Sequence, residues 1–356
     1  MSCQECLSYT SPPTDMEVGV LGAQRAAMLA ALLVAGLVAG CGTVGGSAGQ
    51  QAVAPVEPAS APLGGPAPAG TVVPLGAPAT EVAFDPRTQT VAVALDDPPR
   101  LLLMTLDSAG PPRQVPLPGL AADLVLAADG GPLLVPITAP GSLIRVPLDG
   151  GTPSRTDLPG SAHGMATVGG ITVVALGDRL VVLDGDRLIP GFIDATRLVP
   201  ADNRGEPKIW VLDRGRSAVT VVDLSTGGTS PALRAGNGAA GAVADRFGRL
   251  LVTDTRDGEL LAFAGDPPVL RQRFPLPGAP YGLAYDGRRD LVWVTLTGRD
   301  EVVGLGVAGG EPVIVHRLPT VHQPDAVAVD PVSGRVLVVS ASGAGLQVID
   351  PERVVQ

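Results

Sequence analysis

From about residue 71 onward, the chain alternates short apolar runs with polar turns and shows no helical period. The runs consist mainly of Val, Leu and Ala, and they are bounded by Gly, Pro and Asp. This pattern is typical of strands joined by tight turns. The chain has 47 Gly and 36 Pro among 356 residues, and these are the two poorest helix formers. We therefore expect an all-β domain over residues 71–356.

One unit of this pattern recurs along the domain. Each unit opens with an apolar run that ends at a polar turn, and successive turn residues lie 44, 40, 33, 43, 41 and 44 positions apart. A second and a third apolar run follow, and several units add a weaker fourth run that leads to Leu-Pro-Gly. Four antiparallel strands per repeat of this length are typical of a β-propeller blade. The turn residues are Asp85, Asp129, Gly169, Asp202, Asp245, Asp286 and Asp330.

The repeat predicts a seven-bladed β-propeller. A six-bladed ring or a β-sandwich remains the alternative if the short third repeat is misinterpreted. The last unit, residues 320–356, has room for only three strands. Residues 71–75 precede the first unit and have the character of an outer strand, so we expect them to pair with the last blade and close the ring. Pro74 suits an edge strand because it has no N–H to donate.

The last unit carries the clearest motif. It contains QPDAVAVDP at 323–331, SGRVLVVS at 333–340 and VID at 348–350, and the fourth to sixth units match this pattern fairly well. The pattern resembles the YVTN/NHL class of bacterial propellers, which includes lactonase-like and streptogramin-lyase-like members. This class hosts unrelated functions, so the resemblance implies a fold rather than a reaction.

The amino terminus has the pattern of a secretion signal. Residues 26–39 carry no charge, follow Arg25, and are too few to span a bilayer, which needs about 20. The sequence LVAGC at 37–41 follows and resembles the lipobox of bacterial lipoproteins. The resemblance implies that residues 1–40 are removed and that Cys41 becomes the acylated N-terminus, anchored in the cell membrane on its extracytoplasmic face. A plain signal peptide or an uncleaved anchor is the alternative.

The first residues of the chain do not fit a signal peptide. Glu5, Asp15 and Glu17 occupy positions where a signal should be basic, so we expect translation to start at Met16 or later. Cys3 and Cys6 precede the cleavage point, which leaves the mature chain with no intramolecular disulfide and no Cys metal site.

Residues 41–70 differ in composition from the rest of the chain. After Cys41 they hold five Pro, seven Gly and a single charge, Glu57. Such a composition cannot bury enough apolar surface to form a core. We therefore expect a flexible linker that is dispensable for folding.

The charge balance argues against nucleic acid as a partner. Lys and Arg number 25 against 35 Asp and Glu, which gives a net charge of −10. Binding to nucleic acid requires basic patches that neutralise phosphates. The remaining partners to consider are the lipid bilayer, through Cys41, and a protein or polar ligand at the propeller.

A group of polar residues precedes the predicted innermost strands, which begin at the mouth of the central channel. They could bind a polar ligand, and three of their carboxylates could hold a divalent cation, because hard cations prefer several oxygen ligands. The alternative is that these are ordinary polar turns, in which Asp caps its own backbone. The residues are Glu81, Asp123, His163, Tyr281 and Asp325.

Two histidines are candidates for catalysis. His163 and His322 each precede a predicted inner strand, where an imidazole could act as an acid, a base or a metal ligand. His316 lies in an outer-strand segment and is expected to be structural. The sequence thus favours a membrane-anchored binding or scaffolding module. A metal-assisted hydrolase or lyase of the lactonase or streptogramin-lyase kind is the alternative, and a divalent cation is the one cofactor left open.

The lipobox generates a direct test. Replacing Cys41 with Ala removes the acylated side chain, so we expect the protein to move from the membrane fraction to the soluble fraction. Mass spectrometry of the wild-type membrane fraction should detect an acylated Cys41 as the N-terminal residue. Gly42→Ala is the control and should remain in the membrane fraction. A Cys41→Ala protein that stayed fully membrane-bound would contradict the anchor.

Overall fold

The computed structural model describes residues 52–107, 110–185, 187–201 and 205–353. All regular structure within these ranges is β-strand, as the sequence predicted. These residues contain no helix that could cross a membrane. The predicted signal, Cys41 and linker residues 42–51 lie outside the described residues.

The strands form antiparallel sheets that follow chain order. The first sheet contains β2 (Ala79–Asp85), β3 (Thr90–Asp96), β4 (Pro99–Thr105) and β5 (Arg113–Pro116). The second contains β6 (Val125–Leu126), β7 (Leu133–Ile137), β8 (Ser142–Val146) and β9 (Ser154–Asp157). Two later sheets have the same form: β17 (Ala239–Ala244), β18 (Leu250–Asp254), β19 (Glu259–Ala264) and β20 (Val269–Pro275), then β21 (Pro280–Asp286), β22 (Leu291–Leu296), β23 (Glu301–Gly306) and β24 (Val313–Pro319).

Between the second sheet and these two lies a seven-stranded sheet. Its strands are β10 (Gly164–Val168), β11 (Ile171–Ala175), β12 (Gly177–Val182), β13 (Arg187–Pro200), β14 (Lys208–Asp213), β15 (Ala218–Asp223) and β16 (Leu233–Arg234).

The long strand β13 explains the short third repeat. Its first part pairs with β12, and its second part pairs with β14 after a register shift. One continuous strand is therefore the outer strand of one four-stranded unit and the inner strand of the next, so this repeat lacks the usual connecting loop. With β13 counted in both units, the described strands group into seven four-stranded units.

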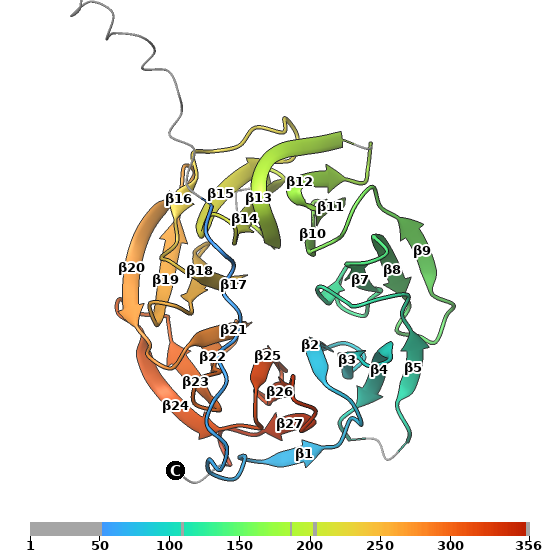
Figure 1. Cartoon of the computed structure of the whole chain (residues 1–356), viewed down its shortest axis with the longest axis vertical. Helices are drawn as coiled ribbons and strands as arrows, with labels where there is room; N and C mark the ends of the chain where they lie inside the picture. Colours follow the sequence, from blue (N-terminus) through green and yellow to red (C-terminus); the bar gives the residue numbers. More distant parts are fainter. Residues whose placement is uncertain (1–51, 108–109, 186, 202–204, 354–356) are drawn as a thin grey trace, which may run out of the picture. The chain divides into compact units, whose positions relative to one another are not determined.

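The sheets stand around a common centre (Figure 1). Neighbouring inner strands pack side by side, with β25 between β21 and β2, and with β17 between β13 and β21. The second strand of each sheet is buried on both faces, and all residues of β7 and β22 are buried. The hydrophobic core therefore consists of layers between adjacent sheets. One layer joins Leu337 and Val339 of β26 to Val91 and Val93 of β3. This is the architecture of a β-propeller, so the predicted fold class is confirmed.

Several of the recurring turn Asp residues cap their own turns. The Asp245 carboxylate accepts hydrogen bonds from the backbone N–H groups of Phe247 and Arg249, both at 2.9 Å. Asp286 and Asp330 form the same kind of bond with residues just after them. These carboxylates are almost completely buried. Their conservation of position within the repeat therefore has a structural cause.

The last sheet contains strands from both ends of the domain. It consists of β25 (Pro324–Val329), β26 (Val336–Ser340), β27 (Leu346–Ile349) and β1 (Thr71–Val73). β1 pairs with β27 in antiparallel register, Thr71 opposite Val348 and Val73 opposite Leu346. The predicted closure by the N-terminal strand is therefore confirmed. The strand ends at Val73, before Pro74.

The prediction of a free linker is wrong for residues 52–70, which we call the strap. Val53 N–H donates to the Gly215 carbonyl at 2.8 Å, and Ala59 N–H donates to Thr297 Oγ1 at 3.0 Å. Val56 and Ala61 are buried. The Pro-rich strap has no core of its own, but loops of the sheets satisfy its backbone groups. Figure 1 shows it as the blue trace that passes β17 and β21.

Two glycines test the closure. A Cβ on Gly70, beside β1, would lie 2.3 Å from the Val348 carbonyl oxygen, whereas a Cβ on Gly76 would meet nothing within 4 Å. Both have nearly the same positive φ, +72° and +78°. Gly76→Ala should cost about 1 kcal/mol of strain. Gly70→Ala should cost clearly more, because the side chain pushes β1 away from β27.

Thermal unfolding of both variants measures the difference. We expect the melting temperature of Gly70→Ala to be several degrees below that of Gly76→Ala. Equal melting temperatures would show that the β1–β27 ladder does not hold the ring closed.

Candidate functional site

A cavity of about 490 Å³ lies where the inner strands begin. Each of the seven units contributes to its wall, and the strap adds Glu57 and Pro58. All five residues that the sequence placed at the channel mouth line this cavity. They are Glu81 of β2, Asp123 before β6, His163 before β10, Tyr281 of β21 and Asp325 of β25.

Glycines allow the inner strands to approach each other closely around this cavity. A Cβ on Gly241 would lie 2.7 Å from the Tyr281 carbonyl oxygen, and one on Gly282 would lie 2.6 Å from the Asp325 carbonyl oxygen. Thr253 links two units, because its hydroxyl donates to the Tyr281 carbonyl and accepts from Gly241 N–H. The backbones that carry Tyr281 and Asp325 are thus fixed by direct contact between units.

Arg197 of β13 is the residue that the sequence interpretation missed. Its guanidinium lies 2.7 Å from a carboxylate oxygen of Glu81 and 2.7 Å from one of Asp123. The repeat contained a signal for it, since Arg197 lies five residues before Asp202. Tyr281 lies five before Asp286, and Asp325 five before Asp330. The same repeat position therefore lines the cavity in these three units.

Two carboxylates of the cavity, Glu81 and Asp325, hold protons more tightly than usual. Burial raises the pKa of Glu81 to about 7, against the attraction of Arg197 and with help from the charges of Asp123 and Asp325. Burial likewise raises the pKa of Asp325 to about 6, and the charge of Glu57 adds to this shift. Asp123 and Glu81 together raise the pKa of Arg197 further above its ordinary value, so Arg197 is permanently charged.

This geometry argues against a divalent cation between Glu81 and Asp123. Arg197 lies between Glu81 and Asp123 and supplies the positive charge that the sequence assigned to a divalent cation. Within the described ranges, one group of three carboxylates is compact enough for a shared ion, and it lies elsewhere: Asp254, Asp257 and Glu259. Asp254 already accepts two backbone hydrogen bonds at 2.9 Å, and Glu259 pairs with Arg273.

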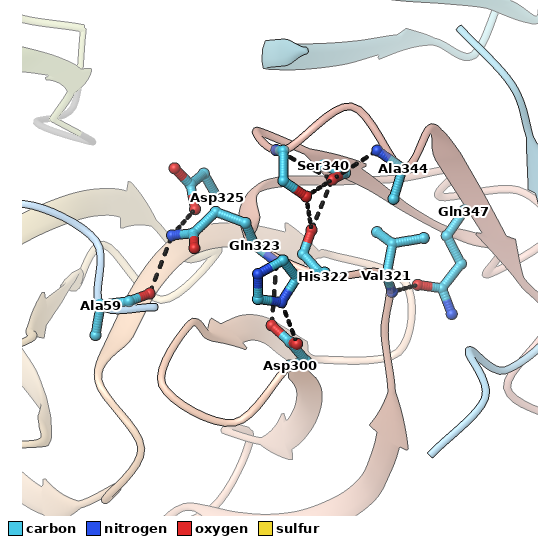
Figure 2. A network of polar contacts seen from close by, with 10 residues as sticks. Ala59, Asp300, Val321, His322, Gln323, Asp325, Ser340, Ala344 and Gln347 are labelled. Atoms are coloured by element: carbon cyan, nitrogen blue, oxygen red, sulfur yellow. Dashed lines mark hydrogen bonds and ion pairs between the residues drawn. The ribbon is translucent and has the colours of Figure 1, made fainter. Parts of the chain in front are cut away.

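The two candidate catalytic histidines occupy different environments. His163 lines the cavity, and its Nδ1 lies 3.9 Å from an Asp194 carboxylate oxygen. His322 does not line it. The His322 Nδ1 lies 2.7 Å from Asp300 Oδ2, and its backbone carbonyl accepts a hydrogen bond from Ser340 Oγ at 2.6 Å (Figure 2). His322 therefore organises the turn before β25.

His316 has the structural role expected for it. It lies in the outer strand β24, and its ring stacks on Trp293 with the centroids 5.4 Å apart. Burial lowers the pKa of His316, which favours the neutral ring.

Gln323 connects the strap to the cavity. Its side-chain Nε2 donates to the Ala59 carbonyl at 3.0 Å and to Asp325 Oδ1 at 3.1 Å (Figure 2). On the other side, Arg214 lines the cavity and its Nη2 donates to the Val56 carbonyl. The strap is therefore held by residues of the site itself.

Comparison with known proteins supports the fold. No family model and no curated protein matches the chain. Virginiamycin B lyase from Staphylococcus aureus has a similar structure, with a TM-score of 0.65 and 13% identity over 78% of this chain and 97% of its own. The β-propeller domain of Cps50 (Swd1) from Myceliophteria thermophila has a TM-score of 0.66 and 14% identity over 80% of this chain and 99% of its own. At these identities the likeness shows the β-propeller fold alone.

The pKa of Asp325 leads to a testable pH dependence. An unfolded chain ionises this carboxyl near pH 4, whereas the folded protein keeps the proton to about pH 6. The free energy of unfolding should therefore fall as the pH rises between these values and stay lower above them. The Asp325→Asn variant lacks this titrating group, so its free energy of unfolding does not fall in this way. We expect the melting temperature of the variant, relative to that of the wild type, to increase between pH 4.5 and pH 8.

Asp178→Asn is the matched control. Asp178 lies at the start of β12, is largely exposed and does not line the cavity. Its effect on melting temperature should vary less with pH over the same range. An Asp325→Asn effect that is constant from pH 4.5 to pH 8 would contradict the shifted pKa.

Proposed function

We propose that this protein is a lipid-anchored, extracytoplasmic module of the cell membrane whose β-propeller binds a small polar ligand. The observation that carries the ligand proposal is the convergence of all seven units and the strap on one cavity of about 490 Å³. Small-molecule sites have volumes of roughly 300–1,000 Å³, and this cavity is within that range. The anchor rests on the lipobox at Cys41.

The chemistry of the cavity wall supports a polar ligand rather than an apolar one. Charged side chains from four separate units and from the strap face the same space. Glu57 is exposed, whereas burial leaves the other groups with few alternative partners, and a ligand with complementary groups would regain that lost solvation. The residues are Glu57, Glu81, Asp123, Arg197, Arg214 and Asp325.

The second proposed function is catalytic, as a hydrolase or lyase. It is favoured by His163, which lines the cavity and has an Asp194 carboxylate oxygen 3.9 Å from its Nδ1. An imidazole of this kind could transfer a proton to or from a bound substrate. If the protein is an enzyme of this kind, the His163→Gln substitution should abolish turnover of the bound molecule but leave its binding largely intact. Under the binding reading, the bound molecule would be recovered unchanged.

The binding proposal is tested by blocking the cavity. Ala242 on β17 lines it, so a Trp at this position would fill part of the space. Wild-type protein purified gently from membranes, and then mixed with a small-molecule extract of the same cells, should show a bound ligand by native mass spectrometry. Ala242→Trp should lose that ligand, because the side chain occupies its site.

Ala264→Trp is the control, since Ala264 ends β19 and does not line the cavity. It should keep the ligand. The proposal would be overturned if wild type carried no ligand, or if both Trp variants kept it while remaining folded.

A further inference from the structure

We propose that the ligand of the central cavity is a small organic cation, an amine or a guanidine, held by Asp325 and Glu57 with the Tyr281 ring beside it. This inference rests on the proposed function and adds the chemical class of the ligand. It is carried by three features of the described residues: unbalanced charge, cavity carboxylates that do not gather closely enough to share a metal ion, and the size and lining of the cavity.

The cavity holds more negative than positive charge. Four carboxylates line it, against two guanidinium groups. Arg197 is already engaged with Glu81 and Asp123 at 2.7 Å each, and Arg214 donates to the Val56 carbonyl of the strap. Asp325 accepts a hydrogen bond from the neutral Gln323 amide. In the part of the chain that the structure describes, neither Asp325 nor Glu57 forms an ion pair with a protein cation.

The remaining charge matches an organic cation better than a metal ion. A metal ion requires several carboxylate oxygens around one point, but Arg197 already separates Glu81 from Asp123. A cavity of about 490 Å³ is far larger than a dehydrated ion and accommodates a molecule with a carbon skeleton. Tyr281 adds an aromatic ring, and such rings attract cations over their faces.

The protonation state of the cavity links ligand binding to pH. Burial keeps the pKa of Asp325 near 6 and that of Glu81 near 7. The charged or titratable groups that share the cavity with them are Glu57, Asp123, His163, Arg197, Arg214 and Tyr281. A bound cation favours the ionised carboxylates and therefore lowers both pKa values. Binding should release protons, and affinity should increase as the pH rises from 5.5 to 7.5.

The test uses simple probes of matched size. Butylammonium, choline and agmatine are the cations, and butanol and butyrate are the neutral and anionic controls. Isothermal titration calorimetry with the full chain at low salt should detect binding of at least one of the cations. It should detect no binding of butanol or butyrate. The affinity should be several-fold higher at pH 7.5 than at pH 5.5, and binding should release protons to the buffer.

Two variants locate the cation within the cavity. Asp325→Asn should weaken binding by about tenfold or more, which is the usual effect of losing a charged hydrogen-bond partner. Glu57→Gln, on the exposed part of the strap, should also weaken binding, and it provides a second variant in case Asp325→Asn folds poorly. Asp178→Asn should bind like wild type, since Asp178 does not line the cavity.

Each outcome bears on a different claim. Binding of butyrate or butanol instead of the cations overturns the cationic ligand but leaves a polar-ligand module intact. Cation binding that is unaffected by both Asp325→Asn and Glu57→Gln overturns the assignment to this cavity. If no probe binds and native mass spectrometry of the wild-type protein also finds no ligand, both the inference and the proposed function are wrong.

Discussion

The mutual burial of sheet faces is the constraint on which the rest of this structure depends. The second strand of each sheet is apolar on both faces, as the fully buried β7 and β22 show. Such a sheet is covered only by sheets on either side of it, so the series must close on itself. The β1–β27 ladder completes the last sheet with the first strand of the domain. Residues 71–73 thus join the two ends of the domain with backbone hydrogen bonds.

The same constraint creates the functional site. Closure brings the starts of seven inner strands to one centre, where Gly241 and Gly282 let adjacent backbones approach closely. Side chains at these positions share a small space and lose much of their water. Charged groups there must compensate each other, and Arg197 does so for Glu81 and Asp123. Among the described residues Asp325 forms no ion pair with a protein cation, and burial, together with the charge of Glu57, raises its pKa to about 6.

How much the sequence could predict depended on whether a feature was local or repeated. The spacing of turn residues predicted the propeller, and the three-strand last unit predicted the closure. The starts of the predicted inner strands placed five residues at the cavity, and Arg197, which was not predicted, holds the same repeat position as Tyr281 and Asp325. The role of His322 depends on a hydrogen bond to Asp300, 22 positions earlier. The composition of the strap excluded a core of its own but could not reveal partners such as Thr297.

One amide group links the strap to Asp325 of the cavity. Gln323 Nε2 donates one hydrogen bond to the Ala59 carbonyl of the strap and one to Asp325 in the cavity (Figure 2). A change in the charge of Asp325 alters the strength of its hydrogen bond with this amide, which also holds Ala59. Such coupling acts equally in both directions. The strap also carries Glu57 to the cavity. If ligand binding stabilises the docked strap by a given factor, docking of the strap must increase the affinity for the ligand by the same factor.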